Sequence, residues 1–513
     1  MKNKFFTGQI CAEAQIRRLR ERHGIRMLFN SYIFVFLFFP LVVLGYYAFH
    51  HWKKPKMALG YLLLMSMLFY GYNSIKYLFI LMISVVLNYA MAELLDRTSR
   101  LALRRLLLAA GLGVNLGILF YYKYYDFFIE NINKWLKMDY AFLQLMLPLG
   151  ISFYTFQQLS YVIDTYRGEC EKYSFLEYAS YVTFFPQLIA GPIVYHDELI
   201  PQLRDKKNHK INYENLSKGL YAFSLGLAKK VLIADTLSKI VTMGYEDIHY
   251  IYTMTVIIIT ICYSLQIYFD FSGYCDMAYG IGYMFNVKLP VNFNSPYKAV
   301  SVTDFWDRWH MTLTRFFTKY VYIPLGGSRK GKVRTYLNIL IVFFVSGVWH
   351  GANWTFILWG VLNGVANVID KLIGRFLEWI PKFIRRIGIF ILATYAWALF
   401  RSPSIRQAKR MWKHLKEFGE GRVYTPILET FNNLTEMRVV YRLGLGGVID
   451  RYPVLPLVVF LILLILACFF MKNTQEKVED GRYGAKRLAV TTVLLLWSVL
   501  SLSDVSEFLY FNF

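Results

Sequence analysis

Two histidines, His310 and His350, are the side chains of this sequence best suited to proton transfer. His350 lies inside the apolar run FFVSGVWHGANWTFILWG, and His310 lies 40 residues earlier, in a segment that mixes aromatic and charged residues. An ionisable side chain within a transmembrane run is costly and usually faces the protein interior or a wet cavity. Because imidazole suits general-base work near neutral pH, the pair predicts a site that binds an acyl donor and deprotonates a hydroxyl.

Each histidine also has a structural interpretation. His350 could hydrogen-bond to a neighbouring helix, and His310 could be an interfacial residue oriented toward lipid headgroups. Gly351 and Asn353, directly after His350, favour a function, because glycine leaves room for a substrate and asparagine offers a donor and an acceptor. Two histidines in the least lipid-like third of the chain are a stronger signal than either one alone.

Other polar residues in apolar surroundings are predicted to be structural. Asp270 and Asp276 are expected to cap or hydrogen-bond at a helix break beside Gly273. His196 and Asp197 are interpreted as an ordinary loop pair.

Several function classes are excluded by motifs that are missing. The sequence has no G-x-S-x-G, H-E-x-x-H, Walker A or Rossmann fingerprint, so a serine hydrolase, a zinc protease and an ATP-driven pump are poor interpretations. The five cysteines are scattered without metal-ligand spacing, and no metal site is expected. The net charge of +23 is concentrated in links between apolar runs, which indicates cytoplasmic loops and anionic lipid rather than nucleic acid.

The elements that must position the histidines are membrane helices. The 513 residues are 56% hydrophobic and 18% aromatic, and the mean hydropathy is +0.36, too apolar for a soluble protein of this size. Roughly 11 to 13 apolar runs are long enough to cross a bilayer. They recur along the whole chain, which predicts an all-α polytopic membrane protein with one integrated domain over residues 27–513.

Residues 1–26 form a separate N-terminal extension with seven Lys or Arg and no apolar run. By the positive-inside rule, this basic flank predicts one orientation of the first span, and the basic HHWKKPK segment after that span predicts the opposite orientation. The extension is therefore interpreted either as translated from an upstream start codon or as an unusual cytoplasmic tail. It is not a signal peptide, because no small-residue cleavage site follows the apolar run.

Two further segments are predicted not to span. LPLGISFYTFQQLSYVIDTYRGE (147–169) carries glutamines and an aspartate that lipid would not tolerate, so it is expected inside the protein body, along a cavity. From about Val302 an amphipathic helix is predicted. Its polar stripe holds Asp304, Arg308 and Arg315, and His310 falls on the border with the opposite stripe. That opposite stripe contains Trp306, Trp309, Leu313, Phe316 and Phe317.

Several long motifs in a fixed order resemble the membrane-bound O-acyltransferase (MBOAT) family, and the branch they resemble most is that of bacterial alginate O-acetyltransferases. The likeness runs from about Met27 to the C-terminus. The motifs are LPLGISFYTFQQLSYVIDTYRGE, FFPQLIAGPI, YFDFSGYCDMAYGIG, NFNSPY, DFWDRWHMTLTRFF, YIPLGG and WHGANWTFILWG.

The resemblance implies a fold of roughly 11 transmembrane helices, plus re-entrant and amphipathic helices, around a central funnel. It also implies that His350 is catalytic and that His310 is a second functional histidine. An enzyme of this family in the bacterial cytoplasmic membrane takes an acyl group from a cytoplasmic thioester, here expected to be acetyl-CoA. The thioester is a substrate and not a tightly bound cofactor. The acyl group passes to hydroxyls of an extracellular polysaccharide, directly or through an extracytoplasmic esterase-like or transferase-like partner.

Two residue roles and two other functions stay open at this point. Asn353 or a backbone N–H is expected to steady the oxyanion. Tyr510, in the tail SEFLYFNF, resembles the tyrosine proposed as a covalent acyl relay in related envelope systems, although it could instead be an interfacial anchor. The alternative functions are D-alanyl transfer to teichoic acid and a non-catalytic transporter of an acylated intermediate.

Overall fold

The computed structural model describes residues 27–246, 252–415, 421–481, 484–502 and 508–509. Within these ranges the chain is helical, and the only extended pairing is one isolated antiparallel bridge between Phe293 and Trp309. The predicted all-α fold class is therefore confirmed. The extension 1–26 and Tyr510 lie outside the described residues. One hydrophobic core includes residues from Met27 to Phe508, and the single domain over 27–513 stays a prediction.

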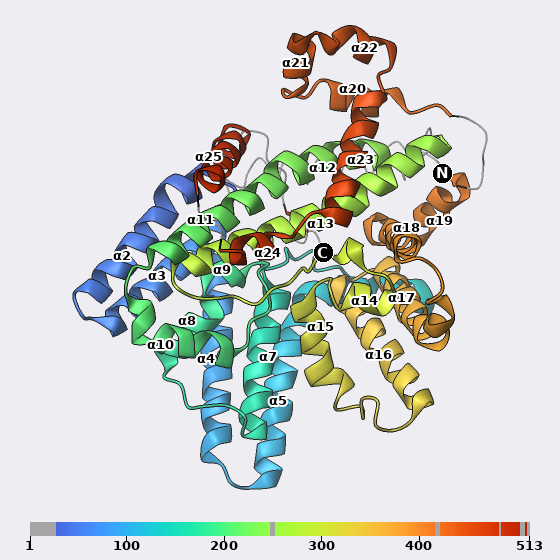
Figure 1. The fold of residues 1–513 in the computed structure, drawn as a ribbon. Helices are drawn as coiled ribbons and strands as arrows, with labels where there is room; N and C mark the ends of the chain where they lie inside the picture. The colour runs from blue at the N-terminus through green and yellow to red at the C-terminus, as the bar shows by residue number, and fades with distance from the viewer. Residues whose placement is uncertain (1–26, 247–251, 416–420, 482–483, 503–507, 510–513) are drawn as a thin grey trace.

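The helices are arranged as shown in Figure 1. The α-helices of the first half are α2 (Phe39–His51), α3 (Pro55–Asn73), α4 (Ile75–Arg97), α5 (Leu101–Leu119), α6 (Tyr125–Leu136), α7 (Ile151–Arg167), α8 (Phe175–Thr183), α9 (Phe185–Leu188), α10 (His196–Arg204), α11 (Tyr213–Ala228) and α12 (Asp235–Glu246). Those of the second half are α13 (Thr253–Met284), α14 (Val302–Trp306), α15 (Met311–Phe317), α16 (Lys332–His350), α17 (Trp354–Ile373), α18 (Lys382–Arg401), α19 (Ile405–His414), α20 (Thr425–Asn432), α21 (Met437–Val440), α22 (Gly446–Arg451), α23 (Leu455–Phe470), α24 (Thr474–Glu479) and α25 (Ala485–Leu500). Single π-helical turns join or extend some of them, among them η1 (Phe34–Phe38), η2 (Phe120–Tyr124), η4 (Lys229–Ala234) and η6 (Thr318–Tyr322).

Seven helical stretches among the described residues are long and apolar enough to cross a membrane: Phe34–His51, Ile75–Arg97, Leu101–Leu136, Thr253–Met284, Lys332–His350, Trp354–Leu377 and Lys382–Arg401. The pair Met437–Arg451 and α23, bent by 106°, would make eight. The sequence predicted roughly eleven. Part of the difference comes from α23 and α25, which have 16 residues each. Such a helix rises about 24 Å, less than the roughly 30 Å of the hydrocarbon core.

The long helix α13 lies at the centre of the molecule and packs closely on α11 (Figure 1). A Cβ on Gly280 would lie 2.6 Å from the carbonyl oxygen of Gly219, and one on Gly273 would lie 2.8 Å from that of Gly226. Glycines therefore allow the two backbones to touch. The predicted helix break beside Gly273 is wrong, because α13 runs through it unbroken and the glycine makes room for α11.

Helix α7 is buried on nearly every side, as predicted for a segment inside the protein body. Some of its buried polar side chains hydrogen-bond to neighbouring helices. The Oε1 atom of Gln158 accepts hydrogen bonds from Asn88 (2.5 Å) and Ser84 (3.1 Å). The helix begins after Gly150 and ends at Gly168, both with a positive φ.

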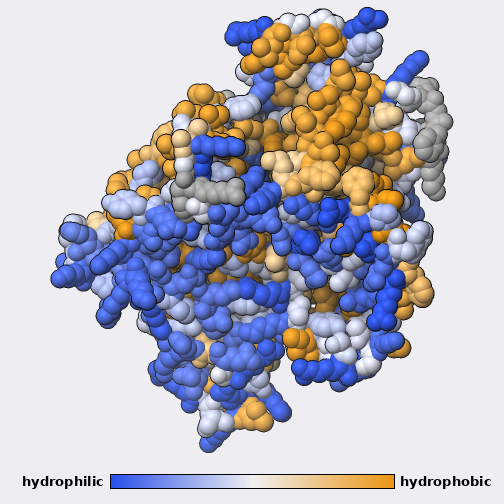
Figure 2. Space-filling model, viewed as in Figure 1, coloured by the Kyte–Doolittle hydropathy of each residue, from blue (hydrophilic) through white to orange (hydrophobic). Residues whose placement is uncertain are grey.

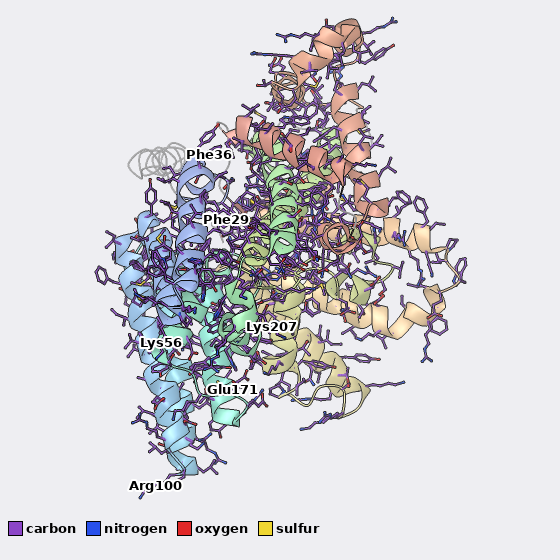
Figure 3. All side chains as sticks on the ribbon, turned by 60° about the vertical axis from the view of Figure 1, so that its left-hand side comes forward. Phe29, Phe36, Lys56, Arg100, Glu171 and Lys207 are labelled. Carbon is purple, nitrogen blue, oxygen red and sulfur yellow. The ribbon has the colours of Figure 1, made fainter. Side chains whose placement is uncertain are left out.

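The molecular surface separates a hydrophilic part from a hydrophobic part. In Figure 2 the lower front is hydrophilic, and the upper region over α23 is hydrophobic. Three basic residues, Lys56 at the start of α3, Arg100 just before α5 and Lys207 in a short 3-10 helix after α10, lie below Phe29 and Phe36 in Figure 3. The positive-inside rule predicts that this basic side faces the cytoplasm.

Candidate active site

His350 is the last residue of α16 and is 4% exposed. Its Nδ1 donates a hydrogen bond to the backbone carbonyl of Ser346 at 2.7 Å, so the neutral imidazole carries its lone pair on Nε2. The rings of Trp349, Trp359 and Phe400 pack edge-on around it, with centroids 4.8, 4.9 and 5.4 Å away. The imidazole is held in one orientation and in the tautomer that a general base at Nε2 requires.

His310 lies in a break between two short helices, and this overturns the predicted continuous amphipathic helix. Helix α14 ends at Trp306 and α15 begins at Met311, with His310 in the left-handed region at φ 48°. The break is stabilised by Asn292, whose Oδ1 accepts hydrogen bonds from His310 Nδ1 (3.1 Å) and from the backbone N and Oγ1 of Thr312 (3.2 and 3.0 Å). Asn292 is 18 residues away along the chain, so local periodicity does not show this contact.

His310 is 1% exposed, although the sequence placed it on a border between polar and apolar stripes. Burial, and then the proximity of His350, hold the pKa of His310 well below its usual range. The side chain is therefore neutral at physiological pH. The predicted apolar stripe is buried as expected: Trp306, Trp309, Leu313, Phe316 and Phe317.

The two predicted histidines belong to one aromatic cluster. The ring of Trp349 lies 4.8 Å from that of His350 and 6.1 Å from that of His310. Phe153, near the start of α7, contacts both Trp349 (5.9 Å) and His310 (6.5 Å). The structure thus brings together His350 and His310, as the sequence analysis expected.

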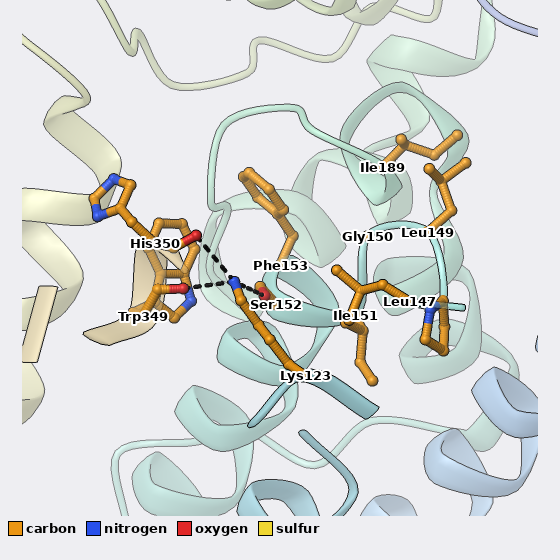
Figure 4. A pocket seen from close by; sticks show the side chains of 11 residues that line it. Lys123, Leu147, Leu149, Gly150, Ile151, Ser152, Phe153, Ile189, Trp349 and His350 are labelled. Atoms are coloured by element: carbon orange, nitrogen blue, oxygen red, sulfur yellow. Dashed lines mark hydrogen bonds between the residues drawn. The ribbon is translucent and has the colours of Figure 1, made fainter. Parts of the chain in front are cut away.

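A small cavity of about 40 Å³ lies beside this cluster (Figure 4). It is lined by Trp349, His350, Lys123, Ile189 and the segment 147–153 that leads into α7. A second, larger cavity of about 350 Å³ shares only Lys123 and Leu147 with the first and extends to residues 351–353. The predicted cavity along the start of α7 is present.

Gly351 and Asn353 form the turn from α16 to α17. The Oδ1 of Asn353 accepts a hydrogen bond from the backbone N of Thr355 (3.0 Å) and caps α17, while its Nδ2 donates to the carbonyl of Pro403 (3.0 Å). A Cβ on Gly351 would overlap the ring of Phe356, so packing alone accounts for the glycine. Asn353 also lines the larger cavity.

Sequence reasoning missed Lys123, which lies within the candidate span Leu101–Leu136. Its Nζ donates hydrogen bonds to the carbonyl oxygens of Trp349 (2.6 Å) and His350 (3.3 Å) and to Ser152 Oγ (3.3 Å), as Figure 4 shows. The signal was available: a single lysine in the run FYYKYYDFF, at the depth of a membrane helix, is a functional candidate by default.

Asp270 and Asp276 form ion pairs with lysines of the neighbouring η4. Lys230 Nζ lies 2.8 Å from both Asp270 and Asp235, and Lys229 Nζ lies 2.6 Å from Asp276. This agrees with their structural interpretation. Across the part of the chain that the structure describes, no group of three or more His, Cys, Asp or Glu could hold a metal ion.

The interpretation of residues 196–197 as an ordinary loop pair is wrong. His196 is buried at the start of α10, and its Nε2 lies 3.3 Å from Asp164 Oδ2, which also accepts hydrogen bonds from Lys319 (2.9 Å) and Tyr320 (2.8 Å). Burial alone would raise the pKa of Asp164, but the hydrogen bonds from His196, Lys319 and Tyr320 hold it below its usual value. The network joins α7, α10 and η6.

The last described residues dock on the central helix. The backbone N of Leu509 donates a hydrogen bond to Asp270 Oδ2 at 2.8 Å. The ring of Phe508 packs against Phe271 (5.8 Å), and Phe271 packs edge-on against His310 (4.8 Å). The residues directly before Tyr510 are therefore anchored one aromatic ring away from His310.

Comparison with known proteins shows the family of this chain. Residues 142–405, which contain His310 and His350, match the sequence profile described as MBOAT, membrane-bound O-acyltransferase family. A peptidoglycan O-acetyltransferase of Helicobacter pylori is 37% identical over 95% of this chain and 98% of its own length. A probable alginate O-acetylase of Pseudomonas putida is 33% identical over 95% of this chain and all of its own length.

A more distant relative represents the D-alanyl branch. The teichoic acid D-alanyltransferase of Bacillus subtilis is 25% identical over 49% of this chain and 67% of its own length. The predicted likeness to the alginate branch is thus confirmed. With its polytopic helical fold, this chain belongs to the membrane-bound O-acyltransferase family and is an acyltransferase.

Proposed function

We propose that this chain moves an acetyl group from a thioester on the cytoplasmic side of a bacterial cytoplasmic membrane to hydroxyls of an envelope polysaccharide outside. The observation that carries the proposal is His350, a buried imidazole with its lone pair on Nε2, beside a small cavity in a membrane-embedded aromatic cluster. The names of the full-length relatives support the acetyl group and the glycan acceptor. The donor, acetyl-CoA, is a substrate and not a resident cofactor.

In the proposed reaction His350 acts as general base. Its Nε2 takes the proton of the acceptor hydroxyl while the hydroxyl oxygen attacks the thioester carbonyl carbon. A C–O bond forms and negative charge develops on the carbonyl oxygen. The predicted hydrogen-bond donor to it is either the second N–H of Asn353 Nδ2, whose first N–H is donated to Pro403, or a backbone N–H. When the intermediate collapses, the C–S bond breaks and the proton on Nε2 passes to the leaving thiolate. The products are an ester and a free thiol, and His350 is neutral again.

His310 is assigned to binding and orienting the donor. Its lowered pKa keeps it neutral, and donation from Nδ1 to Asn292 leaves Nε2 as a hydrogen-bond acceptor. Such a group can hold an amide N–H of the donor without placing a second charge beside His350.

The size of the inner cavity supports a short acyl group. A water-sized group needs roughly 10–15 Å³ of such volume, so about 40 Å³ admits about three of them. This matches the three heavy atoms of an acetyl group, and a fatty acyl chain would not fit without rearrangement.

The docked tail supports the relay role proposed for Tyr510. The backbone N of Leu509 is bonded to Asp270, and Phe508 packs against Phe271, which in turn packs against His310, so the last described residues lie one aromatic ring from His310. In this proposal the Tyr510 phenol is the first acceptor, and an extracytoplasmic partner carries the acyl group on to the polysaccharide.

The D-alanyl alternative differs in its product. D-alanyl transfer would release D-alanine on mild base treatment, whereas acetyl transfer releases acetate. The distant relationship to the D-alanyltransferase, which covers 49% of this chain, makes D-alanyl transfer the second candidate.

The test is the ester content of cell-wall glycan and secreted polysaccharide in a deletion strain complemented with variants at equal membrane levels. His350→Ala is expected to abolish base-released acetate, His310→Ala to lower it strongly, and Tyr510→Phe to abolish transfer to the polymer. His51→Ala, at an exposed histidine, is the matched control and should keep the wild-type level. Full acetate release from His350→Ala cells would refute the general-base assignment, and released D-alanine would replace the acetyl assignment.

A further inference from the structure

Lys123 is a charged group at membrane depth for which the proposed reaction has no use. It lies in η2, a single π-helical turn inside the candidate span Leu101–Leu136, and it is half-buried. Among the described residues no Asp or Glu forms an ion pair with its Nζ, which is compensated by carbonyl and hydroxyl oxygens instead. A lysine in such a place is costly in free energy and needs an explanation.

Two of the three oxygens that Lys123 contacts belong to the helix end that carries His350; the third is the hydroxyl of Ser152. The last carbonyls of an α-helix have no N–H partner within the helix, and a cation is favourable at that end of the helix dipole. Lys123 Nζ bonds the carbonyls of Trp349 and His350, and the adjacent Tyr124 hydroxyl bonds the carbonyl of Val348 at 3.0 Å. Three successive carbonyls of α16 are thus held by two successive residues of η2.

The π-turn explains how neighbouring residues serve the same helix end. In a regular α-helix successive side chains point about 100° apart, and a π-turn widens the helix locally. Such turns occur frequently at functional sites. Figure 4 shows Lys123 reaching across to the backbone oxygens, while the imidazole of His350 points away from the lysine. Lys123 therefore acts on the backbone of the last turn and not on the imidazole itself.

Lys123 is also placed where the two cavities meet. Lys123 and Leu147 are the residues common to the lining of the 40 Å³ cavity and of the 350 Å³ cavity. The larger cavity continues along the turn after His350, past Gly351 and Asn353. Lys123 therefore borders both cavities.

We propose that Lys123 is a positioning residue for acyl transfer at His350. Its ammonium group fixes the backbone of the last turn of α16. The backbone in turn sets the orientation of the His350 side chain. This inference rests on the proposed general-base role of His350. A displacement of about 1 Å in a reacting group costs on the order of 100-fold in rate, so the loss should appear in kcat.

The test measures kcat and KM for acetyl-CoA in proteoliposomes for Lys123→Met, Lys123→Arg and Tyr124→Phe. Lys123→Met is expected to lower kcat about 100-fold with KM within threefold, because methionine still lines the cavity and His310, assigned to binding the donor, is unchanged. Lys123→Arg keeps a cation that can bond both carbonyls and should recover kcat to within about tenfold of wild type. Lys76→Met, which removes an exposed lysine of α4, is the matched control and should equal wild type.

Several outcomes would overturn the inference. It fails if Lys123→Met keeps kcat within threefold, if KM rises in step with the loss of kcat, or if arginine gives no recovery. If Lys123→Met does not accumulate, Tyr124→Phe decides, because it removes only the hydroxyl bonded to Val348: a kcat equal to wild type contradicts positioning by this turn. Activity retained in His350→Ala would instead refute the proposed function, whatever Lys123→Met does.

Discussion

The docked C-terminal segment makes a sharp prediction for Leu509→Pro. Proline has no backbone N–H, so this change removes the hydrogen bond to Asp270 Oδ2 and leaves Asp270 paired with Lys230. A hydrogen bond to a charged group contributes about 1.5–3 kcal/mol. Its loss should lower the docking equilibrium constant of the segment by about 10- to 150-fold. The core of the protein keeps its ion pair, so global stability should change little.

The assay combines acyl transfer in membranes with hydrogen–deuterium exchange of the peptide that contains Phe508. Leu509→Pro should exchange faster and lose most transfer to the polysaccharide. Leu509→Ala keeps the N–H and trims a half-buried side chain, so it is the matched control and should stay near wild type. Unchanged exchange in Leu509→Pro would show that the bond contributes nothing to docking. Faster exchange with full transfer would show that docking is not needed for the reaction.

Three further predictions concern the helix packing and the buried charges that support the site. Lys230→Met removes the cation that pairs with two buried carboxylates, which should cost about 3–5 kcal/mol and lower the midpoint of thermal unfolding in detergent; an unchanged midpoint would contradict the buried triad. Gly280→Ala forces α11 away from α13 and should cost about 1–3 kcal/mol, whereas Gly113→Ala, with open space around it, should be neutral or slightly stabilising; equal effects would refute the close contact. Because the pKa of His310 is lowered on folding, the unfolded chain binds more protons below pH ~6.5, and stability should fall as pH drops through that value. His310→Gln should flatten this slope, and an identical slope in both proteins would be evidence against a buried neutral histidine.

Sequence patterns identified the features that depend on local composition. His350 within its apolar run and the polar groups of α7 could be recognised because lipid does not tolerate them, and both are buried in protein as predicted. The apolar stripe that includes Trp306 and Trp309 was predicted correctly because the periodicity of apolar residues indicates which face of a helix is buried.

The features that sequence missed depend on contacts between distant segments. The break at His310 is held by Asn292, and the burial of His196 depends on Asp164, 32 residues earlier. Asp270 needs no helix break because Lys230 comes from another helix. None of these partners is set by spacing along one element, so a single sequence does not reveal them. Lys123 differs, because its position alone was informative.

The transporter alternative requires one half of the molecule to move against the other around a fixed site. The segment before residue 247 and the segment after residue 251 are joined by the pair Lys230 and Asp270 and by the glycine contacts between α11 and α13. Breaking one such buried pair costs about 3–5 kcal/mol. Coupling between a ligand and a conformational change typically supplies about 1–3 kcal/mol, which is less than this one contact. Acyl transfer needs no such separation, because both histidines already belong to one aromatic cluster beside a cavity of acetyl size. The energetic difference therefore favours catalysis without a relative movement of the two segments.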